Sequence, residues 1–104
     1  IGITPQTFDS VISGGRMDCG FYQTFMQYVL QRDRDAHKFT LSNALKDVRY
    51  LEAVANDAGI PNPVGNAVKN VYAQAVAAGK GDDFVPMLSD FVASQSRLSL
   101  TDKG

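Results

Sequence analysis

The stretch from Phe39 to Gly59, FTLSNALKDVRYLEAVANDAG, constrains the fold most, because its apolar residues recur at helical spacing. They predict a helix of about five turns with one apolar face, formed by Leu41, Ala44, Leu45, Val48, Leu51, Ala55 and Ala58. A hydroxyl oxygen of Thr40 or Ser42 can cap the start of this helix by accepting a hydrogen bond from a free amide of its first turn. Gly59 is expected to end it, since glycine enters the left-handed conformation without a Cβ penalty.

Polar side chains occupy the opposite side of this helix, with Lys46 in its second turn. A cation at that position gains nothing from the helix dipole, which favours positive charge at the C-terminal end. A surface lysine on an amphipathic helix is usually just solvated. Taken alone, Lys46 therefore has a simple structural interpretation, and a functional one needs a further reason.

The rest of the chain predicts more helices and no strands, so the expected class is all-α, with about five helices packed as a bundle in one domain, 1–104. Their expected spans are Thr4–Ile12, Asp18–Gln31, Leu41–Ala58, Pro63–Ala78 and Phe84–Ser94. Thr4 and Asn62 stand at cap positions before a proline, which suits the first turn of a helix. Gly79-Lys80-Gly81 is expected to form a C-terminal turn, and Asp82 or Asp83 to cap the last helix. Residues 95–104 are polar and are expected to fray.

Composition excludes several function classes. A net charge of −1 and the lack of a basic stripe exclude an electrostatic nucleic-acid footprint. One histidine, His37, rules out a His-rich metal site, so no metal ligand is assigned. No apolar run is long enough to span a bilayer and no signal peptide opens the chain, so no membrane partner is expected. The single cysteine, Cys19, fits a reducing compartment, and a cytoplasmic location is expected.

The helix from Asp18 to Gln31 carries aromatic groups on several sides, including Phe21 and Phe25. Core or interface packing is the expected role of these groups, since no lysine or arginine is interleaved with them. Cys19 is interpreted as a half-buried thiol. The chain begins at Ile1 without an initiator Met, and we interpret it as a fragment, a processed chain or an expressed domain.

Several segments in a fixed order resemble a known family: Phe39 followed by the Lys46-Asp47 pair, AGIP at 58–61, Tyr72 with Ala75, and GKGD at 79–82. Together they resemble the C-terminal helical domain of the β-hydroxyacid dehydrogenases, the group of 3-hydroxyisobutyrate and tartronate semialdehyde reductases. The resemblance covers nearly all of the chain. It implies a helical domain like that of 6-phosphogluconate dehydrogenase-type enzymes, which closes over the cofactor and a small hydroxyacid and mediates oligomerisation.

The resemblance also implies where the chemistry lies. The family's Rossmann domain and its catalytic lysine would lie upstream, so no residue of this chain is assigned a catalytic role. Lys46 matches the lysine that reaches the bound NAD or NADP. Asp47 matches an acid that orients this lysine or lines the substrate side, and Phe39 matches an aromatic residue near the cleft. The 104-residue chain alone is expected to be inactive and to hold no cofactor.

Two functions are therefore considered. The first is the C-terminal domain of an NAD(P)-dependent 3-hydroxyacid dehydrogenase, with the Rossmann domain of the same protein as its partner. The second is a free-standing α-helical interaction or dimerisation module that uses the aromatic helix around Phe21. A homo-oligomer is expected, because the interdomain helix that would cover the apolar face around Phe8, Phe25 and Leu45 is missing and several hundred Å² of apolar surface would then be exposed.

Overall fold

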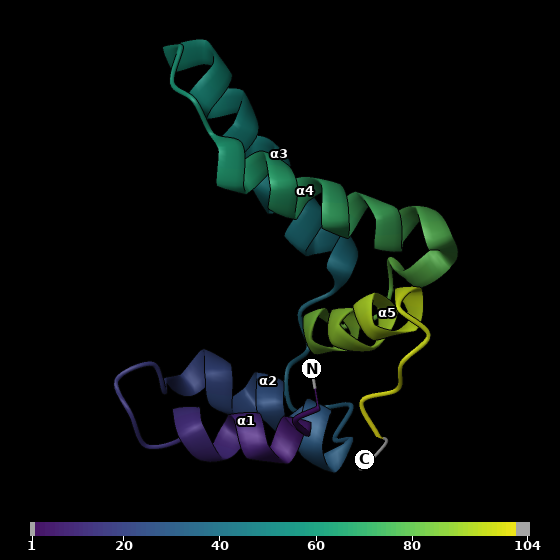
Figure 1. Cartoon of the computed structure of the whole chain (residues 1–104). Helices are drawn as coiled ribbons and strands as arrows, with labels where there is room; N and C mark the ends of the chain where they lie inside the picture. The colour runs from purple at the N-terminus through teal and green to yellow at the C-terminus, as the bar shows by residue number, and fades with distance from the viewer. Residues whose placement is uncertain (1, 102–104) are drawn as a thin grey trace. The chain divides into compact units, whose positions relative to one another are not determined.

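The structure of the protein, a computed structural model, describes residues 2–101 (Figure 1). It contains α1 (Pro5–Ile12), α2 (Gly20–Gln31), α3 (Leu41–Ala58), α4 (Pro63–Ala75) and α5 (Leu88–Gln95). A π-helical turn, η1 (Val76–Lys80), follows α4, and a 3-10 turn, η2 (Val85–Met87), precedes α5. Across residues 2–101 no strand forms, and Thr40 and Phe84 make an isolated bridge. The predicted all-α class and its five helices are confirmed.

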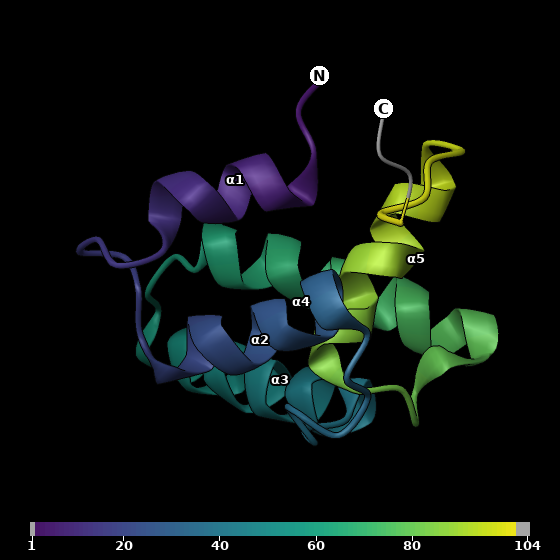
Figure 2. The same ribbon diagram turned by 90° about the horizontal axis from the view of Figure 1, so that it is seen from below.

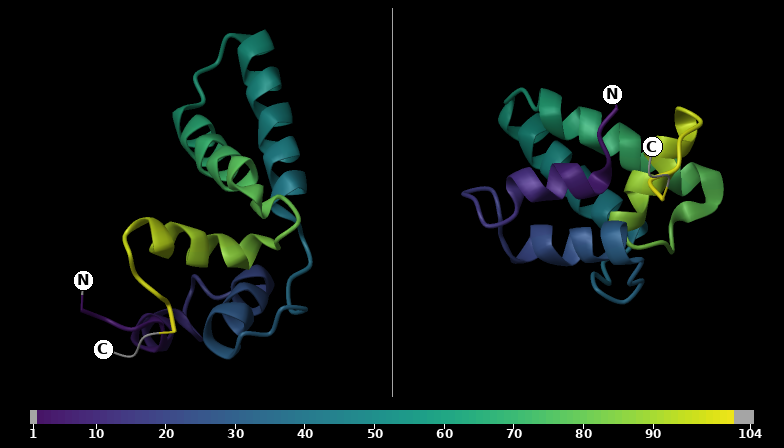
Figure 3. Two further views of the ribbon diagram at one scale, coloured as in Figure 1. Left: turned by 90° about the vertical axis from the view of Figure 1, so that its right-hand side faces the viewer. Right: turned by 60° about the horizontal axis from the view of Figure 1, so that its bottom comes forward.

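The described residues group into two compact units. One contains the residues up to Lys38 and those from Pro86 onward, and is called the α1/α2/α5 unit. The other is Phe39–Val85, called the hairpin unit because α3 and α4 run antiparallel in it (Figure 3). Within the described part of the chain, no helix is long and apolar enough to cross a membrane.

The hairpin unit begins and turns at the residues that the sequence predicts. The Thr40 hydroxyl accepts from the Asn43 amide at 3.2 Å, which caps α3. Gly59 ends α3 in the left-handed region at φ 67°. Pro63 opens α4 as predicted. Asn62 stands at the cap position before it, but its side chain makes no capping hydrogen bond, so that part of the prediction is wrong. The buried residues of the two helices are Leu41, Ala44, Leu45 and Ala75.

The far half of the hairpin unit is less buried than the apolar pattern predicts. Leu51 was expected on the inward face, but its side chain is 53% exposed. Val54 on α3 and Val64 on α4 are also exposed, at 65% and 75%. Two helices cover each other along one line of contact only, so the apolar residues beside that line stay open to solvent.

In the α1/α2/α5 unit, α1 starts at Pro5 after Thr4, whose hydroxyl accepts from the Thr7 amide at 3.1 Å. Figure 2 shows α1, in purple, and α2, in blue; the two helices contact each other. Of the large groups of α2, Met26, Tyr28 and Val29 are buried, while Phe21 remains 57% exposed. Helix α2 thus combines buried groups with an exposed aromatic ring.

The end of the hairpin unit differs from prediction. Helix α4 was expected to reach Ala78, but it ends at Ala75, and η1 continues to Lys80 with Gly79 at φ 86°. Neither Asp82 nor Asp83 caps α5: that helix follows η2, and its cap residue Met87 makes no side-chain hydrogen bond. The cap prediction is wrong because the backbone of residues 83–85 bonds with the start of α3 instead, through the Asp83 carbonyl and the Val85 amide.

Candidate cofactor-binding site

Lys46 lies in the second turn of α3 with an exposed side chain. Its Nζ atom is 5.8 Å from the centroid of the Tyr50 ring, one helical turn further along. Among residues 2–101, no carboxylate forms an ion pair with this ammonium group. Within this range, the charge of Lys46 is therefore not neutralised by a carboxylate and is available to an anion from outside.

Asp47 and Phe39 are also at the surface. Asp47 is exposed, and as the next residue after Lys46 on a helix it does not face that side chain. Phe39 is 38% exposed and stands two residues before α3, where its carbonyl accepts from the Val85 amide at 2.7 Å. This backbone bond fixes Phe39 beside the start of the helix that carries Lys46.

The amides that open α3 are already occupied. They donate to loop carbonyls and to the cap hydroxyl: Leu41 to Asp83 at 2.8 Å, Ser42 to Gly81 at 3.0 Å and Asn43 to Thr40 at 3.2 Å. A helix start with free amides is a ready anion site, but this one has no donor left to offer. The candidate anion-binding group at this end of the hairpin unit is therefore the side chain of Lys46.

Another lysine of the hairpin unit has a different environment. Lys69 on α4 pairs with Glu52 on α3, and both side chains are about three-quarters buried, with 24% and 27% exposed. This pair links the two helices of the hairpin unit. Lys69 thus has a carboxylate partner, whereas Lys46 has none among residues 2–101.

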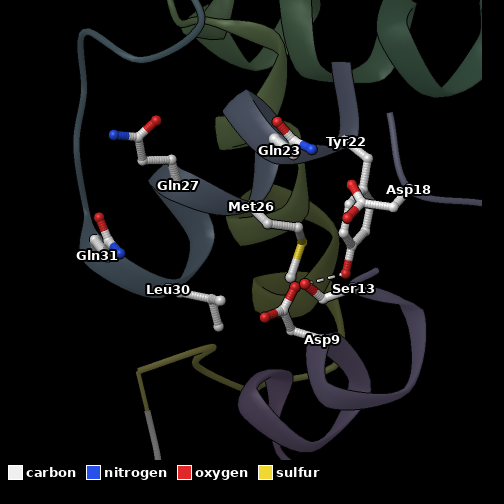
Figure 4. Close-up of a pocket in the computed structure, with 9 residues that line it drawn as sticks. All are labelled: Asp9, Ser13, Asp18, Tyr22, Gln23, Met26, Gln27, Leu30 and Gln31. Atoms are coloured by element: carbon white, nitrogen blue, oxygen red, sulfur yellow. Dashed lines mark hydrogen bonds between the residues drawn. The ribbon is translucent and has the colours of Figure 1, made fainter. Parts of the chain in front are cut away.

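The α1/α2/α5 unit contains a polar cavity of about 260 Å³ between α1, α2 and the loop that joins them (Figure 4). The Tyr22 hydroxyl donates to Asp9 Oδ1 at 2.8 Å at its wall, and the Gly14 amide donates to Asp18 Oδ2, also at 2.8 Å. Burial, followed by the bond to Asp9 and the charges of Asp9 and Asp18, raises the pKa of Tyr22 to about 12. Tyr22 therefore stays protonated near neutral pH and acts as a hydrogen-bond donor.

A second polar cluster joins α2 and α5. Asp90 accepts from the Tyr28 hydroxyl at 2.7 Å and from Arg32 Nη1 at 2.9 and 2.7 Å. Burial and the bond to Asp90 raise the pKa of Tyr28. Burial lowers the pKa of Arg32, but its bonds to Asp90 and Tyr28 outweigh this and raise it. All three groups are satisfied by one another, so the cluster stabilises the unit.

Neither polar cluster was predicted from the sequence, because their partners are 13, 58 and 62 residues apart.

Cys19 is exposed, so its prediction as a half-buried thiol is wrong. It directly precedes the first residue of α2. His37 Nδ1 lies 2.8 Å from the Thr24 hydroxyl, and its ring meets Phe21 edge-on. Among the described residues no group of His, Cys, Asp or Glu side chains is arranged to hold a metal ion.

Residues 1–90 match the protein-family model described as NAD-binding of NADP-dependent 3-hydroxyisobutyrate dehydrogenase. The chain belongs to this family. The match includes the whole hairpin unit and with it Lys46, Asp47 and Phe39. No curated protein matches the chain.

Membership in the 3-hydroxyisobutyrate dehydrogenase family confirms the resemblance at that level and associates the chain with NAD-dependent oxidoreductases. It supports NAD or NADP as the cofactor of the complete enzyme. The family description attributes NAD binding to the matched segment and does not name it a C-terminal substrate or dimerisation domain. NAD binding is also the chemistry for which an unpaired surface cation is suited.

Proposed function

We propose that this chain is the helical part of an NAD(P)-dependent 3-hydroxyacid dehydrogenase. In this proposal a Rossmann domain precedes it in the same polypeptide, and the helical part closes over the cofactor and a small hydroxyacid. The observation that carries the proposal is Lys46. It is an exposed cation on the longest helix, it has no ion-pair partner among residues 2–101, and it lies in a segment that matches an NAD-binding family.

Lys46 is suited to this task by its chemistry. Its ammonium group is a compact charge with three donors on a flexible stem, so it can reach a phosphate, ribose or carboxylate oxygen across a cleft. Hydride transfer is the chemistry that the dinucleotide supplies when it is bound. Lys46 holds the dinucleotide, while Asp47 and Phe39 line the substrate side. The acid or base for the reaction comes from the preceding part of the enzyme.

We also propose that the enzyme is a homo-oligomer. The support is the apolar surface of the hairpin unit, where Leu51, Val54 and Val64 are each more than half exposed. Several large apolar side chains exposed on one helical hairpin favour an interface with another copy of the protein. Sedimentation equilibrium at several concentrations tests this, and a monomer mass at the highest concentration would count against it.

The experiment that tests the proposed function uses the whole reading frame that contains this chain. The frame should encode a Rossmann glycine fingerprint before Ile1, and its product should bind NAD or NADP in a calorimetric titration. The Lys46→Ala variant should bind the preferred dinucleotide more weakly. A frame that lacks such a domain, or a variant that binds as the parent does, would contradict the proposal.

A further inference from the structure

We infer that Tyr50 is a positioning residue for Lys46, holding the ammonium group against its ring so that the group is presented to the anionic part of the dinucleotide. This inference rests on the proposed function of Lys46 and adds a residue to the same site. The family match covers both positions but assigns no role to either side chain.

The geometry of α3 brings the two side chains together. Residues four apart lie on the same side of a helix, and a side chain there leans toward the turn before it. The ring of Tyr50 therefore covers the turn that carries Lys46, and Nζ lies 5.8 Å from the ring centroid. A cation within about 6 Å of a ring centroid is attracted by the negative face of the ring.

The core of the hairpin unit does not explain Tyr50. Its side chain is 60% exposed, whereas the residues of α3 that pack inward, such as Leu41 and Leu45, are 1% and 5% exposed. No hydrogen bond of its hydroxyl is formed with any residue in the range 2–101. The contact with the ammonium group of Lys46 is thus the specific interaction that this ring makes within that range.

An aromatic partner has a consequence that a carboxylate would not have. A carboxylate would hold Lys46 in place but would neutralise its charge, and an incoming phosphate would then have to displace it. A ring restrains the ammonium group and leaves its charge unpaired. Lys69, which does pair with Glu52 in the same unit, shows the contrasting arrangement. Tyr50 thereby reduces the conformational entropy that the Lys46 side chain loses when the dinucleotide binds. This pre-organisation raises the affinity for the dinucleotide.

The contact itself can be measured on the chain alone. Lysine side chains are dimethylated with ¹³C, which keeps their charge, and the signal of Lys46 is assigned through Lys46→Arg. The signal should carry a ring-current shift that persists in Tyr50→Phe and disappears in Tyr50→Leu. Val54→Ala, which changes another exposed residue of α3, is the matched control and should leave the signal unchanged.

The role in binding is tested with a double-mutant cycle on the product of the whole reading frame, titrated with NADP⁺ and NAD⁺. Tyr50→Leu should weaken binding about twofold to fivefold, the range expected of an exposed cation–π contact. It should have no effect in the Lys46→Ala background, and Tyr50→Phe should bind as the parent does. Circular dichroism of each variant confirms that the helices are intact.

The outcomes separate the inference from the proposed function. If Lys46→Ala weakens binding but Tyr50→Leu does not, the positioning role is overturned and the function of Lys46 stands. If Tyr50→Leu weakens binding equally in both backgrounds, the ring acts independently of Lys46, and the positioning role is again overturned. If Lys46→Ala binds as the parent does, the proposed function fails and the role of Tyr50 fails with it.

Discussion

Arg32 and Asp90 are 58 residues apart in the chain, yet both carboxylate oxygens of Asp90 accept from Nη1 of Arg32, at 2.9 and 2.7 Å. Arg32 follows the last turn of α2 and adopts a left-handed conformation at φ 60°. Asp90 lies in the first turn of α5. Each charge therefore stands at the helix end whose dipole favours it. The α1/α2/α5 unit consists of an N-terminal and a C-terminal segment of the chain. This pair, with the hydroxyl of Tyr28, links the two segments.

Replacing Asp90 should destabilise this unit. Asp90→Ala removes the acceptor of two donors, and because the pair is about a third exposed we expect a loss of about 1–2 kcal/mol. For a chain of this size the melting temperature should fall by about 4–8 °C per kcal/mol. Asp35→Ala, which breaks the exposed pair of Asp35 with Lys38, is the control and should change little. A melting temperature of Asp90→Ala equal to that of the parent would refute this account.

The hydrogen bond from Tyr22 to Asp9 predicts an alkaline transition. The pKa of Tyr22 is raised from 10.0 to about 12, so the folded state resists ionisation that the unfolded chain allows. The resulting stability is fully present below pH 10 and is lost as the pH rises toward 12. Urea unfolding between about pH 9 and about pH 11 should show a steeper loss for the parent than for Tyr22→Phe. Parallel curves for the two proteins would show that Tyr22 does not contribute.

Gly65 in α4 should gain less from the usual helix-stabilising substitution than a glycine with open space around it. Alanine in place of glycine normally adds about 1 kcal/mol in a helix interior. A Cβ at Gly65, however, would collide with the side chain of Asn62. Since Asn62 forms no side-chain cap, shortening it to alanine should cost little and should restore the gain of Gly65→Ala. Chemical denaturation of the single and double variants gives their free energies of unfolding, which measure this gain.

Gly20, at the start of α2, is the matched control for Gly65. An added Cβ there meets no atom within 4 Å. Gly20→Ala should therefore stabilise the protein by up to about 1 kcal/mol. If Gly65→Ala stabilises the parent as much as Gly20→Ala does, the steric role of Asn62 is wrong.

Lys46→Ala should reduce cofactor affinity or kcat/KM of the complete enzyme about tenfold to a hundredfold. This is the loss of one charge-assisted hydrogen bond, about 1.5–3 kcal/mol. Stability should change by less than about 0.5 kcal/mol, because Lys46 is exposed. Lys46→Arg should restore part of the loss, since a guanidinium fork approaches the same oxygen differently. Arg49→Ala, on the same helix, is the control and should do much less.

The 104-residue chain alone should not oxidise any 3-hydroxyacid. Hydride transfer requires the cofactor to be held against the substrate with an acid or base within reach. Under the proposed function, the acid or base and the Rossmann side of the cofactor site both belong to the preceding domain, and Lys46 alone does not supply them. Absorbance of the reduced cofactor, followed with purified chain and several hydroxyacids, provides the measurement. Turnover above that of an enzyme-free mixture would overturn the division of roles.

Local chemistry made the helices predictable. Thr4 and Thr40 cap with their hydroxyls, Gly59 takes the left-handed conformation, and Pro63 opens α4, each for a reason that concerns only nearby residues. With these signals the first and last residues of α3, Leu41 and Ala58, were both predicted correctly. The exposed position of Lys46 on that helix was also predicted, whereas its role in binding the cofactor stays a prediction.

Contacts between distant segments were not predictable. The capping role expected of Asp83 failed because the backbone there bonds to the start of α3, and no local pattern reveals such a partner. The hydrogen bond from Tyr22 to Asp9 was not predictable for the same reason. The contact of Tyr50 with Lys46 depends on side-chain direction and not on composition.

The backbone bonds that occupy the start of α3 also join the two ends of the hairpin unit, because Phe39 and Val85 share a bond of 2.7 Å and Leu41 and Asp83 share one of 2.8 Å. A segment whose two ends lie side by side can be inserted into a loop of another protein, because the residues on either side of the insertion then stay close together. We call such a segment a cassette. We therefore expect residues 39–85 to be transferable to another protein as one piece. Carried to another scaffold, the cassette would bring Lys46 and Tyr50 with it in register.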